Sequence, residues 1–225
     1  MKNKVDTFIQ GKDNWGFIVS NTYEAIIIDP LDAEKNLGRL KDKKLVGILL
    51  THYHNDHTAG VEGILSKHKV PVWGPAQNSQ APAFVSEKIF DDGSFSLGSF
   101  HFKTTLLPGH SLELASYFID RKIFVGDLLF NLGCGRVVDG DHQTLFDSLQ
   151  KLKSFPVDLE IFVGHDYREK NLSFAQHLDP SYYSALSLDD LEATSSLEME
   201  LWWNPFLRVE TFSDWKQLRD LRDNF

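Results

Sequence analysis

The stretch Thr51-His52-Tyr53-His54-Asn55-Asp56-His57 places three imidazoles and one carboxylate within six positions. It directly follows residues 45–50, which carry no polar side chain and predict a strand covered on both faces. Imidazole and carboxylate groups are good ligands for borderline divalent metals, and alternate side chains of an extended loop point the same way. His52 and His54 can therefore face one point, and Asp56 and His57 another. The spacing indicates two neighbouring metal positions; a single metal site and a polar surface loop capped by Asp56 are the alternatives.

Outward from this loop, the chain alternates strand and helix patterns. Residues 15–20 and 25–29 predict two strands of a hairpin that turns near Asn21-Thr22, and residues 32–40 and 58–68 predict helices. Further apolar runs predict strands at 70–73, 88–90, 100–107, 115–119, 122–126 and 159–163. A helix with Leu145, Leu149 and Leu152 on one face precedes the last of these strands. We expect a mixed α/β fold in which helices cover a sheet or a pair of sheets.

The character of the chain changes after Asp166. Strand patterns give way to helical spacing of apolar residues, and residues 171–207 contain no Lys or Arg. We therefore expect two domains, residues 1–166 and residues 167–225, the second of them helical.

Composition narrows the function classes. The 225 residues carry a formal net charge of −9, which argues against a nucleic-acid or anionic-membrane partner. A single cysteine, Cys134, excludes an internal disulfide and an all-thiolate metal site. No window approaches about 18 uninterrupted apolar residues, so we expect no membrane span. A cytoplasmic protein is the simplest reading.

The pattern of chemistry-bearing residues resembles the metallo-β-lactamase superfamily. Besides the His-x-His-x-Asp-His motif at 52–57, three residues stand in the family's order after predicted strands: His110 behind Pro108-Gly109, Asp127 behind Gly126, and His165 behind Gly164. Two stretches narrow the resemblance to glyoxalase II, the hydroxyacylglutathione hydrolases: Gly133-Cys134-Gly135-Arg136 and Gly164-His165-Asp166-Tyr167. Residues 171–177, Asp179-Pro180, 204–208 and 218–225 also match that family. The resemblance implies an αββα four-layer sandwich with a small C-terminal helical domain, an extension that we expect β-lactamases and persulfide dioxygenases to lack.

The resemblance also implies the site. It assigns one metal to His52, His54 and His110, a second to Asp56, His57 and His165, and a bridging position to Asp127. Asp56 and Asp127 count as catalytic residues as well. The implied cofactor is two divalent ions per chain, expected to be zinc, with iron or manganese as the other candidates. A metal-bridging hydroxide would attack the thioester carbonyl of S-D-lactoylglutathione and yield D-lactate and glutathione, as in methylglyoxal detoxification.

For the substrate, the resemblance places contacts at Arg136, Tyr167, Arg219 and Arg222. A glutathione thioester carries carboxylates, so an acidic protein needs such a local group of cations. Arg219 and Arg222 are three residues apart and so share one helix face. Taken alone, this pair would be read as a solvated helix face. Cys134 is expected to be a small turn residue, with a redox or nucleophilic role as the alternative.

Three function classes remain open at this stage. The leading one is the dinuclear glutathione thioester hydrolase, acting as a monomer on a small-molecule substrate. Two other enzymes are possible: a mononuclear iron glutathione-persulfide dioxygenase, which shares the Gly-Cys-Gly-Arg turn, and a hydrolase of another thioester or of a lactone. A non-catalytic binding domain that kept the fold is the third class.

Overall fold

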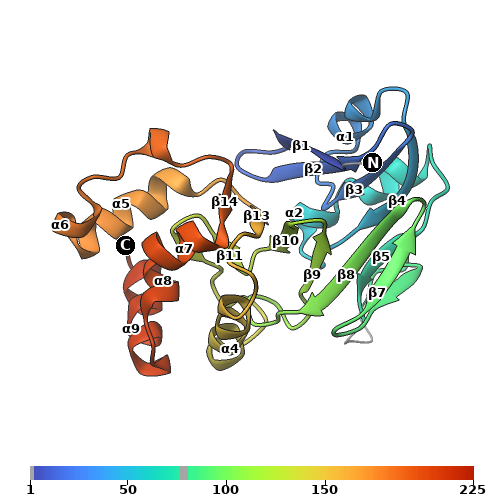
Figure 1. The fold of residues 1–225 in the computed structure, drawn as a ribbon. Coiled ribbons are helices and arrows are strands. Elements are labelled where there is room, and N and C mark those ends of the chain that lie inside the picture. Colours follow the sequence, from blue (N-terminus) through green and yellow to red (C-terminus); the bar gives the residue numbers. More distant parts are fainter. Residues whose placement is uncertain (1–2, 77–80) are drawn as a thin grey trace. The chain divides into compact units, whose positions relative to one another are not determined.

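The computed structural model describes residues 3–76 and 81–225, and the chain divides into two compact units (Figure 1). Unit 1 comprises residues 1–106 and 113–120, and unit 2 comprises residues 107–112 and 121–225. The domain boundary expected after residue 166 is a different division of the chain and stays a prediction. Among the described residues, no helix has both the length and the apolar composition needed to cross a membrane.

Unit 1 is built on a six-stranded sheet in the order β1-β2-β3-β4-β5-β6. Its strands are β1 (Lys4–Ile9), β2 (Trp15–Ser20), β3 (Glu24–Ile28), β4 (Lys44–Leu49), β5 (Val72–Pro75) and β6 (Glu87–Ile89). The first three pair antiparallel, and β3 to β6 pair parallel. A second antiparallel group follows: β7 (Ser94–Leu97), β8 (Phe100–Leu106) and β9 (Ala115–Ile119). Parallel pairing puts the carboxyl ends of β3 and β4 at the same sheet edge, where Asp29 and the histidine loop begin.

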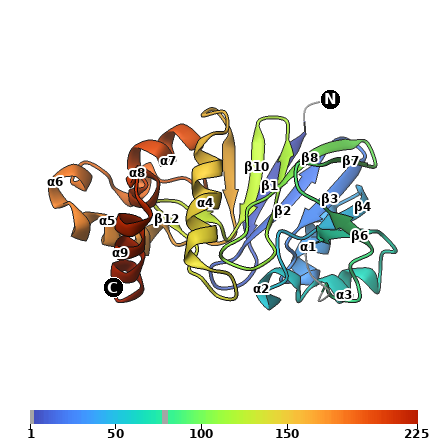
Figure 2. The same cartoon turned by 90° about the horizontal axis from the view of Figure 1, so that it is seen from below.

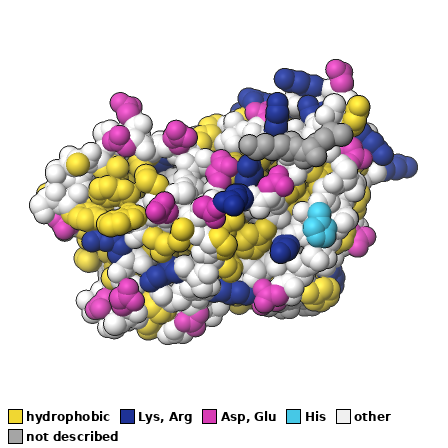
Figure 3. Space-filling model, in the orientation of Figure 1, with side chains coloured by type: hydrophobic (Ala, Val, Ile, Leu, Met, Phe, Trp, Pro, Cys, Tyr) yellow, Lys and Arg dark blue, Asp and Glu magenta, His cyan; other side chains and the backbone are white. Residues whose placement is uncertain are grey.

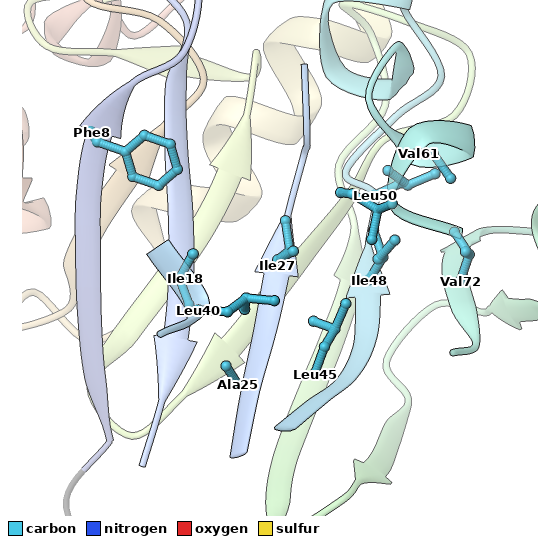
Figure 4. Packing of buried hydrophobic residues seen from close by; sticks show 11 residues of the cluster. Phe8, Ile18, Ala25, Ile27, Leu40, Leu45, Ile48, Leu50, Val61 and Val72 are labelled. Carbon is cyan, nitrogen blue, oxygen red and sulfur yellow. The ribbon is translucent and has the colours of Figure 1, made fainter. Parts of the chain in front are cut away.

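Three helices belong to unit 1: α1 (Ala33–Leu40), α2 (Asn55–Thr58) and α3 (Val61–Leu65). Asp32 caps α1 by accepting a hydrogen bond from the backbone N–H of Lys35. Helices α1 and α3 lie next to each other, as the second view shows (Figure 2). Under them, Ile18, Ile27 and Ile48 stand side by side on β2, β3 and β4 and pack with Leu40 of α1 (Figure 4). This core fixes the strands whose ends carry the histidine loop.

Unit 2 combines a small mixed sheet with six helices in its described residues. Strand β10 (Lys122–Gly126) runs parallel to β13 (Glu160–Val163), which pairs antiparallel with β14 (Thr194–Ser196). A short hairpin joins β11 (Leu129–Phe130) to β12 (Gly133–Cys134). The helices are α4 (His142–Lys153), α5 (Arg168–Leu178), α6 (Pro180–Tyr183), α7 (Leu197–Trp203), α8 (Pro205–Arg208) and α9 (Phe212–Asp223), with a 3₁₀ turn, η1, at Leu188–Asp190.

Most elements expected from the sequence are present, with three corrections. The helix expected over 58–68 is shorter: α3 ends at Leu65, and a separate short α2 begins at Asn55 inside the histidine loop. Strands β1, β7, β11 and β12 were not expected, because they are short or largely polar. Strand β14 lies in the region expected to be purely helical. It was not expected because its three small hydroxyl residues show no apolar strand pattern.

The surface is mixed in charge. On the face shown in Figure 3, acidic and basic side chains are interspersed, and hydrophobic side chains gather over the part of unit 2 that carries α5 and α6. In the same unit, Trp202 is 65% exposed and Met199 39% exposed.

The buried core of unit 1 yields a stability prediction. Ile27 is fully buried on β3, between Ile18 and Ile48 of the flanking strands, so Ile27→Ala leaves a cavity. We expect a loss of about 2–5 kcal/mol in the free energy of unfolding, measured by urea denaturation. Ile9→Ala, at the exposed end of β1, is the control and should cost much less. Equal losses for the two variants would contradict this packing.

Candidate active site

The histidine loop begins where β4 ends. The carbonyl of Thr51 accepts a hydrogen bond from the backbone N–H of Ala115, which ties the loop to β9. His52 and His57 are buried, whereas His54 and Asp56 are partly exposed. Helix α2 begins at Asn55, so the two halves of the motif have different backbones: His54 is extended and His52 lies outside regular structure, whereas Asp56 and His57 lie in a helical turn.

The four side chains face one another within unit 1. Nε2 of His52 lies 3.0 Å from Nδ1 of His54, and the rings of His52 and His57 are 4.2 Å apart between centroids. Asp56 Oδ2 lies 3.8 Å from His57 Nε2 and accepts a hydrogen bond from Asn14. The structure thus brings all four side chains close to one another, and the two neighbouring metal positions expected from the spacing stay a prediction.

Asp29, which the sequence analysis missed, organises this loop. It lies one residue beyond β3 with φ +49°, a conformation that non-glycine residues seldom adopt. Its Oδ1 accepts from the Thr51 N–H at 2.7 Å, and its Oδ2 accepts from the Thr51 hydroxyl at 2.6 Å. The same Oδ2 lies 3.1 Å from His57 Nδ1. An aspartate that ends a buried strand beside a histidine loop is the signal that could have revealed it.

These contacts assign the tautomers of two histidines. Because the single hydroxyl proton of Thr51 goes to Asp29, Thr51 Oγ1 is the acceptor for His52 Nδ1, 3.0 Å away. His57 Nδ1 likewise donates to the Asp29 carboxylate. Both rings then carry their proton on Nδ1, which leaves Nε2 as the atom able to bind a metal.

Unit 2 supplies a second group: His110, Asp127 and His165. Strands β10 and β13 are parallel, so Asp127 and His165, which follow them, meet at the same sheet edge. Asp127 Oδ2 lies 3.3 Å from His165 Nε2 and 3.6 Å from His110 Nε2. All three residues are buried. The strand-end placement expected from the sequence therefore holds for this group.

Backbone contacts position this second group. His110 Nδ1 lies 2.7 Å from the carbonyl of Arg136, which fixes its proton on Nδ1 and leaves Nε2 toward Asp127. Gly109, with φ +133°, approaches α4 so closely that a Cβ would lie 2.2 Å from Cα of Leu145. Gly135 approaches the Asp127 carbonyl equally closely. Only glycine fits these two positions, which is why Pro-Gly-His and Gly-Cys-Gly-Arg surround the site.

The donor set of each unit fits metal binding. Ligand atoms around a tetrahedral zinc ion lie roughly 3.3–3.4 Å apart when the bonds are about 2.0–2.1 Å long. The closest spacings between ligand-type atoms inside each group, 3.0 to 3.8 Å, lie around that value. Imidazole nitrogens and carboxylate oxygens are also the donors that such ions take.

The four residues expected to bind substrate all belong to unit 2 and differ in environment. Arg136 is exposed. Tyr167 stacks on His165, with ring centroids 4.9 Å apart and planes within 7°. Arg219 is 4% exposed, and its guanidinium donates to the Cys134 carbonyl and to Asp223. Arg222 is partly exposed and donates to Asn171, and burial together with the neighbouring Arg219 lowers its pKa.

Cys134 lies at the centre of the Gly-Cys-Gly-Arg turn. Its side chain is buried, and this burial raises the pKa of the thiol to about 11. At neutral pH the thiol is therefore protonated and a poor nucleophile. This environment agrees with the expectation of a small turn residue.

Comparison with known proteins identifies the family. The metallo-beta-lactamase superfamily model matches residues 10–165. A hydroxyacylglutathione hydrolase from Nitrosomonas eutropha is 36% identical over 212 residues, covering 88% of this chain and 83% of the relative. Another from Glaesserella parasuis is 32% identical over 229 residues and covers 95% of each chain.

Solved structures support the fold. ETHE1 from Myxococcus xanthus superimposes with a TM-score of 0.78 at 20% identity, covering 96% of this chain and 90% of its own. The BLEG-1 B3 metallo-beta-lactamase gives 0.72 at 23% identity, covering 92% and 100%. Both alignments exceed the share made up by residues 1–166, so the expectation that β-lactamases lack the C-terminal region is wrong for BLEG-1.

The α/β fold class predicted from the sequence is confirmed by these likenesses, and the His and Asp groups indicate divalent metal binding. This chain belongs to the metallo-β-lactamase superfamily and, within it, to the hydroxyacylglutathione hydrolase family, also called glyoxalase II.

Proposed function

We propose that this protein hydrolyses S-2-hydroxyacylglutathione thioesters, with S-D-lactoylglutathione as the main substrate and D-lactate and glutathione as products. The observation that carries the proposal is the complete set of seven His and Asp ligands in a chain 32–36% identical to curated hydroxyacylglutathione hydrolases over most of its length. The activity belongs to methylglyoxal detoxification. Glutathione keeps the cytosol reduced, so a glutathione thioester substrate fits the expected cytoplasmic location. We propose that the protein acts there as a monomer.

The proposed cofactor is a pair of divalent ions. His52, His54 and His110 would hold one, Asp56, His57 and His165 the other, and Asp127 both, with zinc expected and iron or manganese as alternatives. Bound there, the ions would supply a hydroxide nucleophile at neutral pH and polarise the thioester carbonyl. Asp29, Thr51 and the Arg136 carbonyl keep the ring protons of His52, His57 and His110 on Nδ1.

The proposed substrate contacts are Arg136, Tyr167, Arg219 and Arg222. Arg136 and Arg222 have the accessible guanidinium groups, suited to the carboxylates of glutathione. Arg219 would act indirectly, by donating to the Cys134 carbonyl in the Gly-Cys-Gly-Arg turn that carries Arg136. The thiol of the leaving group has a pKa near ~8.5, so it can depart as a thiolate without protonation by a strong acid. The proposed mechanism therefore assigns no residue as a general acid.

The first test measures turnover and metal content on one preparation. We expect two divalent ions per chain and hydrolysis of S-D-lactoylglutathione. Asp127→Ala should lower kcat/KM by about 100-fold or more while the protein stays folded, and Asp147→Ala, exposed on α4, is the control. Wild-type protein that cleaves only another thioester or a lactone would refute the substrate. One iron per chain with oxygen uptake on glutathione persulfide would instead identify a dioxygenase.

The second test concerns Arg222. Arg222→Ala removes a charge-assisted contact to a substrate carboxylate remote from the reacting carbonyl. We expect KM to rise about 10-fold or more, with a smaller change in kcat. Arg121→Ala, an arginine of unit 2 whose side chain is 79% exposed, should leave both constants unchanged. An unchanged KM for Arg222→Ala would remove this residue from the substrate site.

The third test concerns Asp29. In Asp29→Asn an amide nitrogen replaces one acceptor oxygen, so the N–H of Thr51, the hydroxyl of Thr51 and His57 Nδ1 can no longer all donate to this side chain. We expect metal affinity to fall about 10- to 100-fold, measured by competition with a chelating indicator. Asp32→Asn is the control, because asparagine caps α1 as well as aspartate does. Equal affinities for both variants would show that Asp29 does not position the ligands.

A further inference from the structure

The turn between β11 and β12 has a constrained backbone. Leu132, at its centre, adopts φ +58° although it is not glycine, and it is 2% exposed. This conformation is unfavourable for a leucine and persists only when the surroundings hold it. The turn leads directly into Cys134 and Arg136.

Two buried polar residues hold this turn: Glu200, in the middle of α7, and Asn204, which follows the helix as its C-cap. Glu200 is 3% exposed, and its Oε2 accepts hydrogen bonds from the Leu132 N–H at 3.1 Å and from Asn204 Nδ2 at 2.8 Å. Asn204 is fully buried, and its Nδ2 also donates to the carbonyls of Phe130 at 3.1 Å and Gly133 at 2.9 Å. The amide and two carbonyls of the turn therefore depend on one Glu–Asn pair.

The buried carboxyl of Glu200 lacks a counter-charge in the part of the chain that the structure describes. Within the described residues, no Lys, Arg or His pairs with it, and its burial raises its pKa. Burying a carboxyl group in this way is unfavourable unless its oxygens meet donors. Leu132 and Asn204 provide those donors. An apolar residue would pack better at this position, so packing alone does not explain why a glutamate is buried here.

The turn contacts residues of the candidate site on both sides. Before it, the ring of Phe130 stands edge-on to Tyr167 at 4.9 Å and to His165 at 5.9 Å between centroids. After it, the Arg136 carbonyl accepts from His110 Nδ1. A shift of the turn would therefore move the Phe130 ring that packs against Tyr167, and it would move the residues that lead into Arg136.

We infer that Glu200 and Asn204 are positioning residues that fix the Phe130–Cys134 turn, and through it the glutathione contacts of Tyr167 and Arg136. The substrate part of this inference rests on the proposed function. Both hydrogen bonds, from Leu132 and from Asn204, use Oε2 of Glu200 as the acceptor, a role that the amide oxygen of glutamine can also fill. Glutamine should therefore replace it, and alanine should not.

The experiment compares four variants. Glu200→Ala removes the acceptor, Glu200→Gln keeps it, and Glu198→Ala is a matched control at an exposed position of the same helix. Asn204→Ser removes the donor to the turn but keeps an oxygen able to cap α8, as Asn204 does toward the Phe206 N–H. Thermal unfolding first establishes that each variant is folded at the assay temperature, and Asn204→Ser serves alone if Glu200→Ala does not fold.

The first readout needs no substrate. Cys134 is the only cysteine, it ends the turn, and it is buried, so its rate with a chromogenic disulfide reagent reports how firmly the turn is held. We expect Glu200→Ala and Asn204→Ser to react about 10-fold faster or more than wild type. Glu200→Gln and Glu198→Ala should react at the wild-type rate.

The second readout is steady-state hydrolysis of S-D-lactoylglutathione, with binding of S-methylglutathione, which cannot be hydrolysed, measured by calorimetry. KM and the dissociation constant should rise about five- to tenfold in Glu200→Ala and Asn204→Ser, with kcat nearly unchanged, because remote contacts are misplaced. Wild-type Cys134 rates in both variants would overturn the positioning role. Faster Cys134 reaction with unchanged KM would overturn the link to substrate. Lack of hydrolysis by wild type would refute the proposed function, while the Cys134 rates would still decide the positioning.

Discussion

The carboxylate of Asp29 is the interaction on which the histidine loop depends. It takes both donors of Thr51 and the Nδ1 proton of His57, and because it takes the Thr51 hydroxyl proton, that oxygen accepts from His52. One buried acceptor therefore fixes two imidazoles in the same tautomer. Without it, each buried ring could keep its proton on either nitrogen, and three of the four combinations would block at least one of the two Nε2 atoms expected to bind metal.

Unit 2 reaches the same result with the main chain instead of a carboxylate. The Arg136 carbonyl receives the Nδ1 proton of His110, and the glycines at 109 and 135 allow the backbone to come close enough for this. Main-chain acceptors carry no charge, so this group does not add a second buried carboxylate beside Asp127. The cost is a turn that must be held in place, and three helices of the same unit provide the donors: Asn171 on α5, Asn204 behind α7 and Arg219 on α9.

The two groups of His and Asp residues could be picked out from the sequence because the first is contiguous in the chain and the members of the second follow predicted strands in the order of the family that the chain resembles. Spacing alone singles out residues 52–57, whereas Asp127 and His165 needed the resemblance. Asp29 could not be found this way, since it lies 22 residues from its partner Thr51 and belongs to no motif. Glu200 looks like one more acidic residue on an acidic helix, and only its burial reveals a different role. Long-range hydrogen bonds of this kind leave no local pattern.

The net charge of −9 predicts little about the substrate site, and the arginines explain why. Arg219 is buried, and its guanidinium lies 2.8 Å from Asp223 and donates to the Cys134 carbonyl. Arg222 lies three residues on, donates to an uncharged amide, and keeps part of its surface exposed. At contact distance one partly exposed guanidinium outweighs many screened carboxylates farther away. An acidic surface is therefore compatible with the proposed, doubly acidic substrate, because the buried Arg219 holds the Cys134 carbonyl while Arg222 keeps part of its surface exposed.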